Sequence, residues 1–405
     1  MVNIAVLGYG TIGSGVVEVL STNGESIAKR TGDQINIKYV LDLREFPGDP
    51  IMEKLVHDIN IILEDPEVKI VCEVMGGVEP AYTFVKTALH KGKSVVTSNK
   101  ELVAKHGAEL LKIAKENNLN FLFEASVGGG IPIIRPLNQS LTADEIVEIT
   151  GILNGTTNYI LSKMSEEGLG FEEALSDAQR LGYAERNPAA DVEGHDACRK
   201  IAILSSLAYG MQVDYEDIYT EGITKVTDID FRYAKELGAK IKLFASSIRD
   251  NDRVYAMVAP VMIKSSHPLY SVNDVFNGIF VRGNVIGDVM FYGSGAGKLP
   301  TASAVVADIV DAAKHFGKNI WTIWSSKKLE LTDVNQVKHR FFIRVKGKSS
   351  EVIDQVGRLF GVVEAVKAEG VSDEYAFITD SITEESLKEA VGVMDGVLNI
   401  IRVRF

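Results

Sequence analysis

The segment DVEGHDACRK at residues 191–200 gathers charged side chains directly before an apolar stretch, IAILSSLAYG. Asp196 and Lys200 are four residues apart, so a helix places them on one face. An exposed pair of this kind contributes only about 0.3–0.5 kcal/mol, but the apolar stretch predicts a buried helix whose charged first turns border a cleft. Desolvation there lowers the pKa of a lysine, whereas nearby carboxylates raise it. The spacing indicates acid–base chemistry at Lys200, and His195, on another helix face, is interpreted as a bystander.

A second lysine with a possible role at the active site is Lys100, in TSNKELVA at residues 97–104. It follows a predicted strand, at the sheet edge where open α/β proteins bind ligands. A cation at the start of a helix is not favoured by the helix dipole. The position therefore indicates a functional lysine beside a cofactor rather than a solvated surface charge.

The first glycine-rich turn has the pattern GxGxxG, formed by Gly8, Gly10 and Gly13 between a predicted strand and a predicted helix. Such a turn lets the backbone approach a pyrophosphate at the helix N-terminus, so a dinucleotide is the expected cofactor. Asp42 ends the second predicted strand and would bond a ribose 2′-hydroxyl, which favours NAD. Arg44 would instead meet a 2′-phosphate, so the sequence leaves NAD and NADP open.

Two further glycine-rich turns occur. GSGAGKLPTAS at 293–303 has Gly293, Gly295 and Gly297 before a proline that suits a first helical turn, and it is expected to close over the cofactor or substrate, or to serve as a hinge. EASVGGGIPIIRPL at 124–137 places Glu124 beside a glycine turn. Carboxylate and carbonyl oxygens there would suit a hard cation, while on the residues alone a turn between domains is favoured.

The elements that must position these residues follow from periodicity. Short apolar strands alternate with helical segments over the first 130 residues, which predicts a parallel doubly wound sheet of the Rossmann type. A mixed α+β pattern follows, and the last stretch has the order βαββαβ. The first predicted domain is the dinucleotide-binding Rossmann domain at 1–130, which is completed by a helix at 299–318. It is followed by a catalytic and dimerisation domain at 131–298, a polar linker at 325–338 and a small C-terminal domain at 339–405.

Composition limits the partners. The net charge is −12 and no run of Lys and Arg occurs, which argues against nucleic acid and anionic membranes, because phosphate binding needs clustered cations. No stretch of 18 apolar residues predicts a membrane span. Cys72 and Cys198, the two cysteines, form no CxxC pair, so neither a disulfide framework nor a zinc site is expected. We expect a cytoplasmic protein.

Taken together, these motifs resemble the homoserine dehydrogenase family. The resemblance runs in family order over residues 1–320, through GYGTIGSGV, TSNKELVA, EASVGGGIPIIRPL, GILNGTTNYIL, GYAERNPAADVEGHDACRK and FYGSGAGKLPTASAVVADI. It implies NAD(P)-linked interconversion of L-homoserine and L-aspartate 4-semialdehyde, within threonine and methionine synthesis, by a homodimer or a higher homo-oligomer.

The resemblance also implies roles for individual residues. Lys200 matches the proton-transfer lysine and Lys100 a second active-site lysine. The substrate would be bound by Glu185, Asp191 and Asp196. A sodium ion would be bound by Glu124, Val127, Gly129 and Ile131. The cofactor would be contacted by Gly8, Gly10, Thr11, Ile12, Gly13, Asp42, Arg44, Ser98, Lys100, Gly182, Gly295 and Gly297.

The C-terminal segment 339–405 resembles an ACT domain in its βαββαβ order. Such domains in this pathway often bind an end-product amino acid, here threonine. The usual ligand loop is replaced by KGKSSEV at 346–352, so the alternative is that the segment contributes to assembly alone.

Two rival functions remain on the sequence. An aspartate-semialdehyde dehydrogenase would need a cysteine nucleophile, but Cys72 lies within a predicted strand and Cys198 within a predicted helix, beside no evident base. A non-catalytic, NAD-linked sensor of an amino acid would not need both Lys100 and Lys200. The enzyme is therefore the favoured interpretation.

Overall fold

The computed structural model describes residues 1–405, apart from the side chains of residues 349 and 351. The chain forms two compact units that are each assembled from separate stretches. The first unit contains Met1–Glu145, Ala202–Asp214 and Gly293–Leu329, and the second contains Ile146–Ile201, Tyr215–Tyr292 and Glu330–Phe405. The chain therefore passes between the units several times, and the residues predicted as 131–298 are shared between both.

The first unit is built on a parallel sheet in the order β3-β2-β1-β4-β5-β6. Its strands are β1 (Val2–Leu7), β2 (Ile35–Leu41), β3 (Leu55–Val56), β4 (Val68–Glu73), β5 (Ser94–Thr97) and β6 (Phe121–Leu122). Continuous apolar strands such as VNIAVL are buried on both faces, as parallel sheets require. The strand order reverses between β1 and β4, which confirms the predicted doubly wound sheet and creates a switch point at its carboxyl edge.

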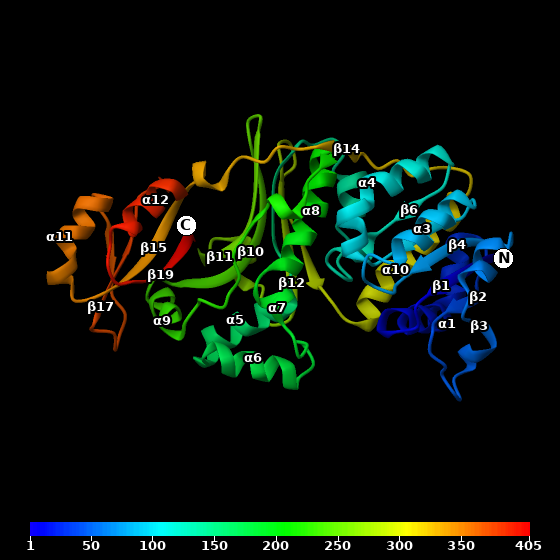
Figure 1. Ribbon diagram of the computed structural model, residues 1–405, viewed down its shortest axis with the longest axis horizontal. Helices are drawn as coiled ribbons and strands as arrows, with labels where there is room; N and C mark the ends of the chain where they lie inside the picture. The colour runs from blue at the N-terminus through cyan, green and yellow to red at the C-terminus, as the bar shows by residue number, and fades with distance from the viewer. The chain divides into compact units, whose positions relative to one another are not determined.

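Helices cover this sheet. They are α1 (Thr11–Thr31), α2 (Ile59–Glu64), α3 (Ala81–His90), α4 (Lys100–Glu116) and α10 (Lys298–Lys314). The helix predicted at 299–318 is α10, which packs along α1 over apolar residues that include Val16, Leu20 and Val305 (Figure 1). Gly15 permits this approach, because a Cβ there would lie 3.0 Å from the Ala302 side chain.

The segment predicted as a polar linker contains a strand. β14 (Ser325–Lys328) pairs in parallel with β8 (Met211–Gln212) in a small separate sheet. Its four side chains are exposed, so the pairing rests on backbone hydrogen bonds that hydropathy does not reveal. The linker itself stays a prediction.

The second unit is built on a large mixed sheet in the order β13-β12-β7-β10-β11-β19-β15-β17-β16. Its strands are β7 (Ile146–Ile152), β9 (Tyr219–Thr220), β10 (Ala239–Asp250), β11 (Arg253–Lys264), β12 (Phe276–Gly283), β13 (Gly287–Ser294), β15 (Lys338–Lys346), β16 (Glu364–Val366), β17 (Glu374–Ile378), β18 (Ile382–Thr383) and β19 (Val397–Arg404). The accompanying helices are α5 (Gly155–Glu167), α6 (Phe171–Arg180), α7 (Ala189–Val192), α8 (His195–Tyr209), α9 (Asp228–Glu236), α11 (Ser349–Phe360) and α12 (Glu384–Gly392). Of these, α8 belongs to the second unit only as far as Ile201, and its later turns are counted in the first unit. The mixed pattern predicted for residues after 130 is thus seen in this unit.

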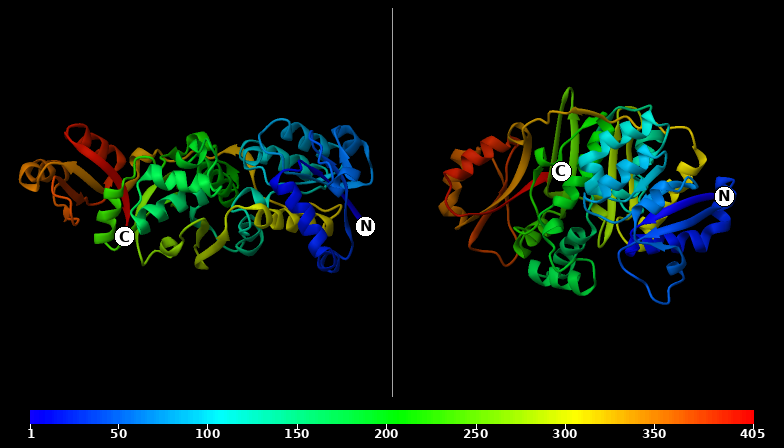
Figure 2. Two further views of the ribbon diagram at one scale, coloured as in Figure 1. Left: turned by 90° about the horizontal axis from the view of Figure 1, so that it is seen from below. Right: turned by 45° about the vertical axis from the view of Figure 1, so that its right-hand side comes forward.

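The C-terminal elements follow the order β15-α11-β16-β17-β18-α12-β19, which is the predicted βαββαβ order with the two-residue strand β18 added. In this segment, α11 and α12 pack on β15 and β17 around Phe341, Val356 and Phe377 (Figure 2). Their sheet continues the sheet of the second unit, because β19 pairs in parallel with β11 from Val261↔Arg402 onward. The KGKSSEV segment spans the end of β15 and the start of α11, and the side chains of its residues 349 and 351 lie outside the described residues. In the described part of the chain, no helix combines the length and apolarity that a membrane crossing requires.

Candidate functional site

The first glycine turn joins β1 to α1 and shows three different uses of glycine. Gly8 has a φ of +96°, which a side chain would strain. A Cβ on Gly13 would lie 1.9 Å from the Gly8 carbonyl oxygen, so only glycine fits there. Gly10, at the N-cap of α1, has open space where its Cβ would be. Tight turn, close packing and open backbone together fit a dinucleotide pyrophosphate.

This difference predicts separable effects of two substitutions. Gly10→Ala should raise the Kd for the dinucleotide by about tenfold or more while leaving the melting temperature near that of the wild type, because its Cβ enters open space on the ligand side. Gly13→Ala should destabilise the fold itself through the clash with Gly8. Cofactor titration and thermal unfolding of both variants test this. Unchanged cofactor affinity of Gly10→Ala would contradict the assignment.

Asp42 and Arg44 lie together just after β2. The Asp42 carboxylate accepts hydrogen bonds from the backbone N–H of Tyr9 at 2.8 Å and from Nε and Nη2 of Arg44, both at 2.9 Å. The Arg44 guanidinium holds the pKa of Asp42 well below its usual range. Arg44 remains 62% exposed, and its guanidinium lies over the Phe46 ring. The two residues that the sequence offered as alternatives therefore form one pair beside the glycine turn.

Lys100 is the first residue of α4 and is half-buried. Two side chains that sequence reasoning missed fix this turn. Asn99 caps α4 by accepting the Leu102 N–H at 3.1 Å, and buried Glu73, at the end of β4, accepts the Thr97 hydroxyl at 2.6 Å and the Met75 N–H at 2.8 Å. Burial raises the pKa of Glu73. The backbone that carries Lys100 is therefore fixed by hydrogen bonds at the carboxyl edge of the sheet.

Glu124 is buried, and its carboxylate faces backbone amides. It accepts hydrogen bonds from the N–H groups of Ile133, Ile134 and Arg135 at 2.6–2.8 Å. Those bonds occupy much of the acceptor capacity of a carboxylate. Burial and the charge of Glu124 raise the pKa of neighbouring Asp308 to about 8. Within the described residues, no cluster of three or more His, Cys, Asp or Glu suits a metal ion.

The two later glycine turns contact each other within the first unit. A Cβ on Gly129 would lie 2.5 Å from the Gly295 carbonyl oxygen. The Gly130 N–H donates to the Ser294 carbonyl at 3.1 Å, and a Cβ on Gly130 would lie 2.8 Å from Pro300. Gly297 begins α10 with a φ of +116°. The 293–303 turn is thus anchored against the turn that follows Glu124.

The second unit assembles the charged cluster at the start of α8. Lys200 Nζ forms an ion pair with Asp196 Oδ2 at 2.7 Å and donates to the Leu153 carbonyl at 2.7 Å. The Lys200 and Asp196 side chains are only 12% and 9% exposed, so this is a buried pair rather than a surface one. The prediction that the two residues share a helix face is confirmed by these contacts.

Asn154 connects the carboxylates and was missed by sequence reasoning. Its Nδ2 donates to Asp191 Oδ1 at 2.7 Å and to Asp196 Oδ2 at 2.8 Å, while its Oδ1 caps α5 by accepting the Thr157 N–H at 2.9 Å. One amide thus holds Asp191 and Asp196 in a fixed relation. An asparagine before the helical segment GTTNYIL was the available signal.

The remaining predicted residues of this region lie closer to solvent. Glu185 and Gly182 are exposed in the loop between α6 and α7, where Gly182 has a φ of +77°. His195 is 55% exposed and lies 3.1 Å from Glu193 through its Nε2. Asp191 is half-buried in α7. Asn154 therefore links Asp191 to the cluster that contains Lys200. Glu185 stays in the exposed loop between α6 and α7.

Neither cysteine provides a nucleophile. Cys72 and Cys198 are both buried, and burial raises the pKa of both thiols. A raised thiol pKa removes the thiolate that attack on a carbonyl needs. The cysteine-dependent alternative therefore loses its chemistry.

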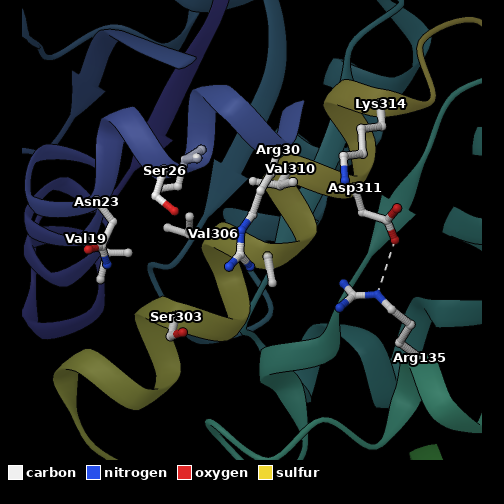
Figure 3. Close-up of a pocket in the computed structure, with 12 residues that line it drawn as sticks. Val19, Asn23, Ser26, Arg30, Arg135, Ser303, Val306, Val310, Asp311 and Lys314 are labelled. Carbon is white, nitrogen blue, oxygen red and sulfur yellow. Dashed lines mark hydrogen bonds and ion pairs between the residues drawn. The ribbon is translucent and has the colours of Figure 1, made fainter. Parts of the chain in front are cut away.

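A wide groove of the first unit is separate from these residues. It has a volume of about 610 Å³ and lies between the later turns of α1 and α10, where Arg135 pairs with Asp311 at 3.2 Å (Figure 3). Arg30 and Ser26 line it from α1, and both are exposed. The groove contains none of the glycine-turn residues that the structure describes, so size alone does not identify the functional site.

Comparisons with known proteins agree with this geometry. A family model described as the NAD-binding domain of homoserine dehydrogenase matches residues 8–124, and one described as homoserine dehydrogenase matches residues 132–310. A homoserine dehydrogenase from Mycobacterium bovis is 40% identical over 436 residues, covering 99% of this chain and 97% of that protein.

Solved structures give the same result. The crystal structure of a homoserine dehydrogenase from Thiobacillus denitrificans superposes with a TM-score of 0.91 at 34% identity, covering 100% of this chain and 98% of that one. A hyperthermophilic archaeal homoserine dehydrogenase in complex with NADPH has a TM-score of 0.68 at 30% identity, covering 80% and 99%. The chain therefore belongs to the homoserine dehydrogenase family, the NAD(P)-dependent oxidoreductases that interconvert L-homoserine and L-aspartate 4-semialdehyde.

Proposed function

We propose that Lys200 performs the proton transfer of this reaction. The observation that carries the proposal is the placement of its Nζ between Asp196 and the Leu153 carbonyl in a buried polar cluster. The bound nicotinamide supplies the hydride acceptor. In the oxidation of homoserine, Lys200 acts as the neutral amine and takes the hydroxyl proton to become an ammonium group. In the reverse direction this ammonium group polarises the aldehyde and protonates the alkoxide.

The amino-acid end of the substrate carries an ammonium group, for which carboxylates are the natural partners. We assign this role to Asp191, Asp196 and Glu185. Asn154 supports the first two by holding their oxygens, and Glu185 contributes from the exposed loop. Lys100 is assigned as the second active-site lysine on the basis of its place at the start of α4.

The dinucleotide is assigned to the carboxyl edge of the first sheet. The residues proposed to contact it are Gly8, Gly10, Thr11, Ile12, Gly13, Asp42, Arg44, Ser98, Lys100, Gly182, Gly295 and Gly297. The open backbone at Gly10 supports this assignment. Gly295 is kept in place by its contact with Gly129.

We further propose that NADP is the preferred cofactor. Arg44 occupies both oxygens of Asp42 and remains exposed over Phe46, which suits a 2′-phosphate better than a ribose hydroxyl. The archaeal relative was solved with NADPH. Arg44→Ala should lower kcat/KM for NADP about tenfold, through loss of a charge-assisted bond, with little change for NAD. A wild-type preference for NAD would refute this and assign the ribose contact to Asp42.

A monovalent cation, sodium, is proposed to bind at the glycine turn through Glu124, Val127, Gly129 and Ile131. Because the Glu124 carboxylate faces amides, we assign the contact at each position to the backbone carbonyl oxygen, a ligand that hard cations accept. Chelating agents would not compete for such a site, so the test is replacement of sodium by a larger organic cation.

The decisive experiment for the proposed function is absorbance-followed oxidation of L-homoserine by purified protein. NAD and NADP are run in parallel, each with sodium, with potassium and with tetramethylammonium. Turnover that depends on sodium supports both the reaction and the cation. Turnover independent of the cation removes the sodium proposal alone. A folded protein that binds a dinucleotide without turning over homoserine would overturn the enzymatic assignment and favour an amino-acid sensor.

Threonine regulation through residues 339–405 is proposed on the βαββαβ order and on the continuity of β19 with β11. L-Threonine should lower the initial rate and raise the melting temperature in a saturable manner, because a ligand that binds the folded state stabilises it. L-Valine, which replaces the hydroxyl by a methyl group, is the matched control. A titration with threonine that leaves both quantities unchanged would show that these residues serve assembly alone.

A homo-oligomer, expected as a dimer, is proposed from the resemblance and from the edge strand β13. Its outward side chains Met290 and Tyr292 are 43% and 52% exposed, and Val285, in the preceding turn, is 77% exposed. Apolar side chains on an unpaired sheet edge favour association. Light scattering coupled to gel filtration would decide this, and a monomer at working concentration would refute it.

A further inference from the structure

A cavity of about 270 Å³ lies in the second unit, over the region where β10 and β11 meet β15 and β19. This volume corresponds to about nine water molecules, enough for a small organic ligand. It is lined by Phe244, Ser246, Ile248, Tyr255, Met257, Val261, Lys338, His339, Arg340, Ser381, Arg402, Val403 and Arg404. None of the side chains assigned to the homoserine reaction is among these described lining residues.

The cavity has a buried floor and an open rim. Phe244, Ser246 and Arg402 are nearly inaccessible to solvent, whereas Lys338 and Ser381 are exposed. A ligand therefore has an entrance at the rim. The wall beneath it combines apolar side chains of β10 and β11, such as Phe244 and Met257, with polar and cationic side chains of β15 and β19.

The lining is cationic, and the balancing carboxylates lie behind it. Arg402 donates to Glu384 and Glu221, and Arg404 donates to Glu148 and to the Thr150 hydroxyl. These acids keep the guanidinium groups in place but are not among the described residues that line the cavity.

The guanidinium groups retain donors beyond these bonds. Arg402 uses three N–H groups on Glu384 and Glu221, and a guanidinium has five. Arg404, at 34% side-chain exposure, lies nearer the rim with Lys338. Arg340, the third guanidinium in the lining, donates to Glu364 and to the carbonyl oxygens of Thr379 and Phe405. The described lining contains these cations and no carboxylate side chain.

His339 supplies a second, independent sign of a ligand. Its Nε2 atom is buried and has no hydrogen-bond partner among the described residues, and a buried polar atom in that state is costly. The ring is held by Tyr255 and Phe341 at centroid distances of 6.3 and 6.1 Å. Burial, and then the charges of Arg402 and Arg404, lower the pKa of His339 to about 4. The imidazole is therefore neutral near pH 7 and offers one donor or acceptor at Nε2.

We propose that this cavity is a binding site for a small carboxylate anion, with Lys338, Arg340 and Arg404 receiving the carboxylate at the rim and His339 Nε2 bonding a polar group of the ligand further in. The assignment does not depend on the roles proposed for Lys200 or Lys100. The chemistry required of the ligand is a carboxylate on a short chain of no more than about nine non-hydrogen atoms.

Isothermal titration of the full-length protein with succinate tests the proposal. Succinamide, which has the same size without the charge, is the control ligand, and ionic strength is held constant with sodium chloride. Succinate should bind at one saturable site and succinamide should show no saturable heat. The heat should persist in Lys200→Ala, which removes the buried cation of the substrate cluster and lies outside the cavity lining. Loss of the heat in that variant would move the anion to the substrate cluster and overturn the assignment.

Three variants locate the site. His339→Phe keeps an aromatic ring against Tyr255 and should weaken succinate binding about tenfold through loss of Nε2. Lys338→Ala, at an exposed position that does not affect packing, should weaken it about threefold. Lys367→Ala removes an exposed charge from the same C-terminal elements, outside the cavity, and should leave the affinity unchanged. Wild-type affinity in both His339→Phe and Lys338→Ala would refute the site.

Discussion

Lys200→Ala is expected to lower kcat for homoserine oxidation by about 10²–10⁴-fold, the usual contribution of a positioned acid–base group. The Kd for the dinucleotide should remain near the wild-type value, because the glycine turn that receives it is built by β1 and α1 in the first unit. Alanine leaves Asp196 buried without the cation that pairs with it at 2.7 Å. A measurable loss of stability should therefore accompany the loss of rate.

The matched control for this variant is Lys163→Ala. Lys163 also pairs with an acid four residues away, Glu167 at 2.6 Å, and belongs to the same unit, but it lies on α5 and its partner is 52% exposed. Its removal should change kcat little and stability by at most about 0.5 kcal/mol. Single-turnover kinetics with fluorescence-monitored cofactor titration would separate the outcomes. A Lys200→Ala protein that has lost cofactor binding as well would not support the proton-transfer role.

The second large effect is expected at Asn154, a positioning residue. Asn154→Ala removes both the amide that joins Asp191 to Asp196 and the cap of α5. KM for homoserine should rise about ten- to a hundredfold, since each hydrogen bond to a charged group contributes about 1.5–3 kcal/mol. Loss of the cap should also lower the unfolding free energy by about 1 kcal/mol.

Asn154→Ser separates the two roles. Serine caps a helix about as well as asparagine, but its single hydroxyl is too short to bridge two carboxylates. This variant should keep near-wild-type stability with a raised KM and a smaller change in kcat. Thr383→Ala removes the exposed cap of α12 and should cost similar stability with KM unchanged. If Asn154→Ser has the wild-type KM, the amide bridge has no part in substrate binding.

Much of the fold could be predicted because its signals are local. Continuous apolar strands such as Val68–Glu73 alternate with amphipathic helices, and a parallel sheet is the arrangement that buries both faces of such strands. Gly8 and Gly13 were informative for the same reason, because the sterics of one βα turn require glycine at both positions, whereas Gly10 has open space at its Cβ position. Asp196 and Lys200 were informative because a helix brings residues four apart together.

The features that sequence reasoning missed depend on contacts between distant segments. In the sequence, Asn154 is recognisable only as a helix cap. In the structure, α7 and α8 bring Asp191 and Asp196 to its amide group. The Glu124 carboxylate suggested a cation ligand, and only the start of the helical segment at 134–140 directs three N–H groups toward it. The β14 strand has exposed, polar residues and carries no hydropathy signal. None of these contacts is encoded by a period or a motif.

The pairing of β19 with β11 has a consequence for protein synthesis. β9 pairs with β11 at Met257 and Val258, but the strand that covers Val261–Ile263 of β11 begins only at Val397. This part of the β11 edge, with its unsatisfied backbone groups, therefore stays uncovered while the ribosome translates the intervening chain. Truncation or a bulky fusion at the β19 end would leave that edge open in the finished protein. Insoluble expression of such clones would then reflect an uncovered strand rather than a damaged catalytic cluster.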